Sequence, residues 1–149
     1  MKALLVHSPN AGTKPEPAAG LIDQLEKAGF AISYCEHGRD DIRSRMIGME
    51  MAIAAGGDGT VASVATEMPD RSLPIAILPM GGSNNIARAL GIRQSAEAVI
   101  GGLNNAREKA LTVGCVIGPF GKKGFLEAVG IGALNQSIEL VDEAPDTPE

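Results

Sequence analysis

The chain has 149 residues, a length that suits one ordinary domain or one domain and part of another. Its formal charge of −5 argues against nucleic-acid binding, which needs a basic face, and its aromatic content of 3% leaves few platforms for stacking bases. No apolar run is long enough to span a bilayer, and the apolar start, residues 1–6, ends too early for a signal peptide. Cys35 and Cys115 lack metal-ligand spacing, so we expect reduced thiols in a cytoplasmic protein.

The apolar pattern predicts alternating strands and helices over the first hundred residues. The expected strands are residues 2–7, 30–35, 49–55 and 73–78, and the expected helices are residues 21–28, 40–46, 60–68, 84–90 and 95–104. Continuously apolar strands separated by helices are typical of a parallel sheet that is covered on both faces. We therefore predict a Rossmann-like, three-layer α/β fold for residues 1–107.

After residue 107 the pattern changes to a partial antiparallel β segment. Residues 110–117 and 125–132 are apolar stretches joined by the glycine-rich residues 118–124, which predicts a hairpin. We interpret residues 108–141, which include an expected helix at 134–141, as the start of a truncated second domain that is rich in β structure. Residues 142–149 are acidic, contain two prolines and are predicted to be a disordered tail. The apolar surface of an unfinished hairpin favours a homo-oligomer.

Three glycine-rich turns follow strands of the predicted sheet. They are Ser8-Pro9-Asn10-Ala11-Gly12 after the first strand, Gly56-Gly57-Asp58-Gly59-Thr60 after the third, and Gly81-Gly82-Ser83-Asn84-Asn85 after the fourth. Glycines allow a backbone to approach a phosphate closely, and the first amides of a following helix point toward it. All three turns lie beyond the carboxyl ends of parallel strands, so we expect them to share one ligand-binding edge.

Asp58 stands in the middle of the second turn, where its charge would repel a phosphate. Its presence is explained if a metal ion or a proton is also handled there, which suggests phosphoryl chemistry. We expect this carboxylate to face a ligand rather than the core, so the substitution Asp58→Ala should leave the fold intact.

The order and spacing of these motifs resemble the catalytic domain of the diacylglycerol kinase family, which is related to sphingosine kinases, NAD kinases and phosphofructokinases. The resemblance rests on residues 8–12, 56–60 and 78–92, and on residues 125–132, which are similar to the segment that leads into the family's second domain. It implies binding of ATP and, in complete members, transfer of the γ-phosphoryl group to a lipid hydroxyl with Mg²⁺.

The resemblance also implies roles for individual residues. Those expected to bind the nucleotide are Pro9, Asn10, Gly12, Gly56, Gly57, Asp58, Gly59, Thr60, Val61, Ala62, Gly81, Gly82, Ser83 and Asn84. Asp58 would be the catalytic residue and would act through Mg²⁺, water or the acceptor hydroxyl. Thr60 is equally well explained as a first-turn helix residue and Asn84 as a helix cap. Arg88 would reach either a phosphate or solvent.

Several positions depart from the family pattern. Gly82 stands where the family has threonine, Asn85 where it has aspartate, and Ser8 where it has asparagine. We expect these changes to weaken nucleotide affinity more than they disturb the fold. Complete members are roughly twice as long, and their second domain supplies a carboxylate and part of the lipid cleft, so this chain alone should lack the full catalytic machinery.

Three functions stay open at this point. The first is the ATP-binding domain of a lipid kinase that works when its C-terminal half is present. The second is a non-catalytic nucleotide-binding or interaction module, and the third is an enzyme that resembles NAD kinase. A lipid acceptor implies transient membrane contact, although Lys122 and Lys123 form the one short basic tip and a hairpin turn is the favoured explanation of it.

Overall fold

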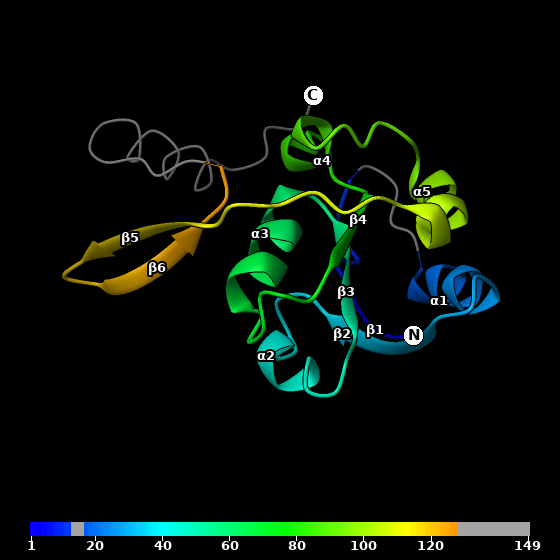
Figure 1. The fold of residues 1–149 in the computed structure, drawn as a ribbon, viewed down its shortest axis with the longest axis horizontal. Coiled ribbons are helices and arrows are strands. Elements are labelled where there is room, and N and C mark those ends of the chain that lie inside the picture. Colours follow the sequence, from blue (N-terminus) through cyan, green and yellow to red (C-terminus); the bar gives the residue numbers. More distant parts are fainter. Residues whose placement is uncertain (13–16, 128–149) are drawn as a thin grey trace, which may run out of the picture.

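A parallel β-sheet lies at the centre of the computed structural model, which describes residues 1–12 and 17–127. Its strands are β1 (Lys2–His7), β2 (Ala31–Glu36), β3 (Met51–Gly56) and β4 (Ile75–Pro79). They lie in the spatial order β2-β1-β3-β4 (Figure 1). All three pairs are parallel, which confirms the predicted sheet.

The carboxyl ends of the strands lie at the same level, along one edge of the sheet. His7, the last residue of β1, lies opposite Glu36 of β2 and Ala55 of β3. Gly56, the last residue of β3, lies opposite Pro79 of β4. The turns that follow β1, β3 and β4 therefore leave the sheet along the same edge.

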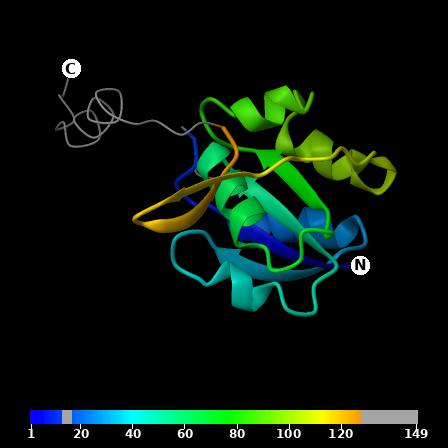
Figure 2. The same ribbon diagram turned by 60° about the vertical axis from the view of Figure 1, so that its left-hand side comes forward.

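Helices cover both faces of this sheet (Figures 1 and 2). They are α1 (Ala18–Lys27), α2 (Ile42–Arg45), α3 (Asp58–Glu67), α4 (Asn85–Ala89) and α5 (Ala96–Gly102), and a 3₁₀ turn, Leu103–Asn105, follows α5. Helices α1 and α5 pack on one face, and α2, α3 and α4 pack on the other. The three-layer arrangement is as predicted, and the expected helices differ from the observed ones only at their ends.

The two faces of β1 explain why its sequence is continuously apolar. Leu4 and Val6 pack in the cluster beneath α3, whereas Leu5 packs in the cluster beneath α1. All three side chains are fully buried. Full burial of a leucine contributes about 1.5–3 kcal/mol relative to exposure, so a strand that is buried on both faces needs an apolar residue at every position.

The chain path places a crevice at the carboxyl ends of β1 and β3. After β1 the chain turns to α1 on one face, and after β3 it turns to α3 on the other. Because these two strands are neighbours, the diverging connections make a topological switch point, which is where open α/β sheets bind ligands.

A separate antiparallel hairpin follows the α/β unit. Its strands are β5 (Gly114–Gly118) and β6 (Gly121–Phe125), and it projects from the side of α3 (Figure 1). A hairpin was predicted here, but the connecting loop predicted at residues 118–124 is wrong, because β6 occupies residues 121–125. Of the predicted second strand, residues 125–132, the part from 128 onward lies outside the described residues. Gly121 has a φ of +87°, which allows the chain to reverse over Pro119 and Phe120 alone. The second strand therefore begins earlier than its polar, glycine-rich sequence indicates.

Two of the sequence predictions lie beyond the described part of the chain. These are the helix expected at residues 134–141 and the disordered tail expected at residues 142–149. Within residues 1–12 and 17–127, no helix has the length and apolar character needed to cross a membrane.

Candidate functional site

The three glycine turns meet at the carboxyl edge of the sheet. A Cβ atom on Gly12 would collide with the carbonyl oxygen of Met80, so the first turn lies directly against the end of β4. A Cβ atom on Gly81 would come within 2.5 Å of the Cα of Gly57, so the second and third turns are also in contact. The absence of side chains at these positions is what allows the three backbones to approach one another.

Thr60 lies beneath the second turn and faces the core. Its side chain is 3% exposed and packs on the backbone of Gly56, where any Cβ atom would collide with it. Its neighbour Val61 is also buried, in the cluster between α3 and the sheet. Of the two interpretations of Thr60 drawn from the sequence, this geometry favours a first-turn helix residue that packs inward.

Asp58 connects the second turn to the third. Its Oδ2 accepts a hydrogen bond from the amide of Asn85 at 2.9 Å, and its Oδ1 accepts one from the amide of Ile86, also at 2.9 Å. Those amides begin α4, where backbone donors have no partner within the helix and a negative charge is favourable. Asp58 therefore also caps α4, a structural role that the sequence analysis did not assign to it.

Asn84 closes the third turn on itself. Its Oδ1 accepts a hydrogen bond from the amide of Gly81 at 2.9 Å, and its Nδ2 donates to the carbonyl oxygen of the same residue at 2.6 Å. With φ at 49° it occupies the left-handed region, which asparagine tolerates better than most residues. Asn84 occupies the N-cap position of α4, as its alternative role predicted, but its side chain makes no cap bond.

The remaining predicted residues line the same edge with more exposure. Asn10, Gly12, Gly59, Gly82 and Ser83 are exposed, and the half-buried ones are Pro9, Gly57, Asp58, Ala62, Gly81 and Asn84. A Cβ atom on Gly59 or Gly82 would meet no heavy atom within 4 Å. Open space therefore surrounds the outer rim of the second and third turns, whereas their inner parts are packed.

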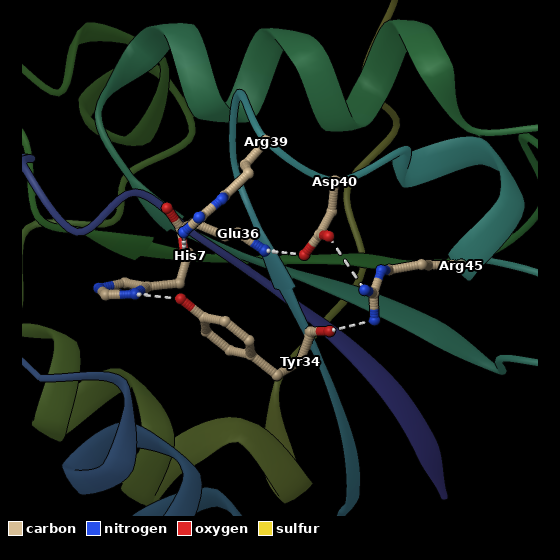
Figure 3. Close-up of polar contacts among 6 residues, drawn as sticks. All are labelled: His7, Tyr34, Glu36, Arg39, Asp40 and Arg45. Atoms are coloured by element: carbon tan, nitrogen blue, oxygen red, sulfur yellow. Dashed lines mark hydrogen bonds and ion pairs between the residues drawn. The ribbon is translucent and has the colours of Figure 1, made fainter.

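A polar cluster at the ends of β1 and β2 is absent from the sequence-based site (Figure 3). The buried His7 places its Nδ1 at 3.4 Å from the hydroxyl of Tyr34. Burial, together with the carboxylates of Glu36 and Asp40, raises the pKa of Tyr34 above its usual value. No motif spacing reveals this cluster, because its members come from different strands and meet only through the sheet register.

Asp40 organises the loop that follows β2 (Figure 3). Its Oδ2 accepts from the amide of Glu36 at 2.8 Å, and its Oδ1 accepts from the guanidinium of Arg45 at 3.0 Å. The amide hydrogen bond, followed by the positive charge of Arg45, lowers the pKa of Asp40. Arg45 also donates to the carbonyl oxygen of Tyr34 at 3.0 Å, so the loop is tied to β2 at two points.

His37 ties the same loop to α3. Its Nε2 lies 3.0 Å from the hydroxyl oxygen of Ser63, and its amide donates to the carbonyl oxygen of His7 at 2.8 Å. These contacts hold the end of β2 beside the helix that begins at the second glycine turn.

The side chains at this edge can hold a metal ion only if a bound ligand supplies most of the atoms that coordinate it. Asp58 is the single carboxylate of the three turns, and no group of three histidine, cysteine or acidic side chains gathers anywhere in the described residues. Each Asp58 oxygen uses one acceptor position on an α4 amide and keeps another. Mg²⁺ is commonly held by one or two carboxylates together with phosphates and water, and Asp58 meets that requirement.

Comparison with known proteins agrees with this fold and these turns. A profile of the family described as "Diacylglycerol kinase catalytic domain" matches residues 2–116. The chain belongs to this family. It is 26% identical over 152 residues to "Diacylglycerol kinase" of Bacillus subtilis (strain 168), covering 91% of this chain and 47% of that protein. It is 31% identical over 147 residues to "Diacylglycerol kinase" of Staphylococcus aureus (strain Newman), covering 91% of this chain and 45% of that protein.

A solved structure shares the fold of this family member. The crystal structure of a diacylglycerol kinase from Bacillus anthracis str. Sterne superimposes with a TM-score of 0.60 at 24% identity, covering 75% of this chain and 42% of that chain. The chain thus spans about half the length of the relatives that it matches, at 47%, 45% and 42% of each.

Proposed function

We propose that residues 1–107 are the ATP-binding domain of a lipid kinase, which transfers the γ-phosphoryl group of ATP to a lipid hydroxyl. The observation that carries this proposal is the contact of the three glycine turns at the switch point between β1 and β3. Side chains at Gly12 or Gly81 would force these turns apart, because a Cβ atom at either position would collide with the backbone of a neighbouring turn. Membership of the diacylglycerol kinase catalytic domain family supports the reaction class.

In this proposal the phosphates of ATP lie over the second and third turns. Backbone amides of residues 57–59 and of Gly82 and Ser83 are suited to phosphate oxygens, because the backbone can approach a phosphate closely where glycines carry no side chain. Mg²⁺, when bound, neutralises charge on the phosphate oxygens. Asp58 would hold it with the acceptor capacity left over from capping α4, and Asn84 keeps the third turn in the shape that faces the ligand.

The acceptor side of the site is proposed to come from a second domain. Residues 108–141 would begin that domain, and the β5–β6 hairpin is its described part. Phosphoryl transfer depends on positioning and on electrostatic stabilisation, so the α/β domain alone should bind nucleotide but turn it over poorly. The names of the relatives support diacylglycerol as the acceptor class.

We place this activity in the cytoplasm, with transient membrane contact to reach the lipid. Cys35 and Cys115 are both free thiols, which suits a reducing compartment. Burial raises the pKa of Cys35 to about 11, so this thiol stays protonated and serves packing rather than chemistry. The exposed apolar side chains of the hairpin, Ile117 and Phe120, support the proposed pairing with another copy of the chain.

Titration of the labelled protein with ATP and Mg²⁺, followed by amide NMR, tests the binding step. Saturable shifts are expected for residues 57–59 and 81–84, and smaller ones for the Pro119–Phe120 turn, which serves as the internal reference. Absence of shifts in the glycine turns at millimolar nucleotide would overturn the proposal. Radiolabel transfer to diacylglycerol in mixed micelles, by a longer chain that includes a complete second domain, tests the reaction.

One observation favours an alternative function, a module that binds a nucleotide without catalysis. Gly82 lacks the hydroxyl that the family pattern has at this position, and the space around it is open, so a nucleotide would lose one contact. A non-catalytic nucleotide-binding module is therefore the second candidate. It predicts ATP binding without transfer, even when the second domain is complete.

A further inference from the structure

A hollow of about 250 Å³ lies at the carboxyl end of β4, beside the third glycine turn. Its lining residues are Pro79, Asn84, Arg88, Ile92, Arg93 and Gln94. None of the glycines of the three turns lines it, and Asn84 is the residue through which it adjoins the crevice described above. Because β4 is an edge strand, this hollow lies beyond the β1–β3 switch point rather than within it.

The hollow concentrates positive charge in an acidic chain. Arg88 and Arg93 both line it, and neither takes part in an ion pair among the described residues, whose salt bridges join Lys27–Asp23, Arg39–Glu36 and Arg45–Asp40. The sequence contains no acidic residue between Asp70 and Glu97. Two guanidinium groups thus share one concave site, and no carboxylate is among the residues that line it.

The segment that carries these arginines is held in place by hydrogen bonds. The amide of Ile92 donates to the carbonyl oxygen of Ala87 at 2.9 Å, and the amide of Arg93 donates to Oε1 of Gln94 at 3.1 Å. Lys109 Nζ donates to the carbonyl oxygen of Leu90 at 3.1 Å, which secures the end of α4. The backbone that carries both arginines is therefore held in place beside the hollow.

The size of the hollow limits the ligand to a small anion or to one group of a larger ligand. Pockets that bury a whole drug-sized molecule measure about 300–1,000 Å³, so this one is too small for a nucleotide. A phosphate group fits, and the guanidinium fork matches its oxygens in pairs through charge-assisted hydrogen bonds. The side-chain amide of Asn84 is already bonded to Gly81, so the two arginines and the carboxamide NH2 of Gln94 are the donors that face a ligand.

We propose that the Arg88–Arg93 hollow is a second anion subsite, which binds a phosphate group. The phosphate belongs either to a nucleotide whose chain extends past Asn84 or to a phosphorylated glycerol. Free phosphate can bind here whether or not a nucleotide binds at the glycine turns, so the two proposals fail separately.

The test is a titration of the labelled protein with inorganic phosphate, glycerol 3-phosphate or ATP, each against sodium chloride at equal ionic strength. Arginine Nε–Hε signals and the amides of residues 84 and 92–94 should shift and saturate. Arg88→Gln and Arg93→Gln should each weaken phosphate affinity about tenfold, as expected for loss of a charge-assisted hydrogen bond. Arg93→Lys, which keeps the charge but loses the fork, should fall between. Arg71→Gln, at the amino end of β4, makes the same charge change and should have no effect.

The two sources of phosphate give different results. If nucleotide phosphates fill the hollow, Arg93→Gln weakens ATP binding and inorganic phosphate competes with ATP. If a phosphorylated glycerol fills it, glycerol 3-phosphate binds together with ATP and Arg93→Gln leaves the ATP-induced shift of Gly57 unchanged. Shifts that do not saturate, or an affinity for phosphate that Arg88→Gln and Arg93→Gln leave unchanged, would overturn the subsite. Shifts in the hollow without any at Gly57 under ATP would retain the subsite and remove the nucleotide proposal.

Discussion

The parallel sheet and the β5–β6 hairpin differ in how much of their surface is buried by other elements. The sheet buries every side chain of β3 and most of β1 between two helical layers. In the hairpin, Ile117 is 77% exposed and Phe120 is 59% exposed, and its described contact with the α/β unit is at Gly124 against Thr66 of α3. A two-stranded hairpin is marginally stable by itself. The comparison indicates that the α/β unit can hold its glycine turns in place alone, whereas the hairpin needs a further layer.

The largest expected effect is the difference in stability between a substitution in the core of the sheet and one in the hairpin. Leu4→Ala removes a fully buried side chain from β1 and should lower the free energy of unfolding by about 2–5 kcal/mol. Ile117→Ala, on the exposed face of β5, should change it by less than about 0.5 kcal/mol. Urea denaturation of both variants measures the difference. Equal losses would show that the hairpin is packed against a core of its own.

The next effect concerns the bridge between the second and third turns. Asp58→Ala should lower the free energy of unfolding by about 1–2 kcal/mol, because two α4 amides lose their acceptor. Asp23→Ala is the matched control, since its ion pair with Lys27 is exposed and should contribute little. Thermal unfolding followed by circular dichroism compares the two. If they destabilise the protein equally, the bridge does not hold the turns together.

A smaller effect is expected when a hydroxyl is added to the third turn. Gly82 has open space at its Cβ position and no positive φ, so Gly82→Thr should fold normally and bind ATP about three- to tenfold more tightly through one added hydrogen bond. Gly81→Ala should instead weaken binding, because the new methyl group would collide with Gly57. Calorimetric titration with ATP measures both. No gain for Gly82→Thr would place the nucleotide phosphates away from this residue.

The smallest effect is a pH dependence of the loop after β2. The pKa of Asp40 is lowered in the folded state, so the unfolded chain binds a proton more readily, and this contribution to stability is present near neutral pH. It is lost as the pH falls below about 4, where aspartates ordinarily titrate. Arg45→Gln should raise the pKa of Asp40, which carboxyl NMR measures. Asp70 is the control: its pKa is lowered by Ser72 and should not change in this variant. A constant Asp40 pKa in Arg45→Gln would show that the guanidinium has no influence.

Sequence reasoning succeeded where the signal was local. Strand β1 was predicted with its observed bounds, residues 2–7, because burial on both faces demands an unbroken apolar run. It failed for β6, whose sequence Gly-Lys-Lys-Gly-Phe has neither apolar alternation nor strong β-formers and so resembles a loop. The turn at Gly121, rather than hydrophobicity, determines where that strand begins.

The candidate site shows the same division between local and distant signals. The glycine turns and their order were visible in the sequence, because glycine at a strand end marks a close backbone approach wherever it occurs. The partners of the polar side chains were not, since Asp58 and Asn85 are 27 residues apart and His7 and Tyr34 are equally distant in sequence. Asn84 was placed correctly at the start of a helix, but the bonds of its side chain to Gly81 depend on a left-handed backbone that the sequence does not reveal.

By itself, then, the sequence determined a parallel α/β sheet with three glycine turns on one edge, since apolar periodicity and backbone freedom are properties of short segments. The tertiary structure alone decided that Asp58 caps α4, that Thr60 faces the core, and that Arg88 and Arg93 share a hollow. Each of these depends on how α3 and α4 pack on the sheet and beside one another, and packing between segments has no local signature in the chain.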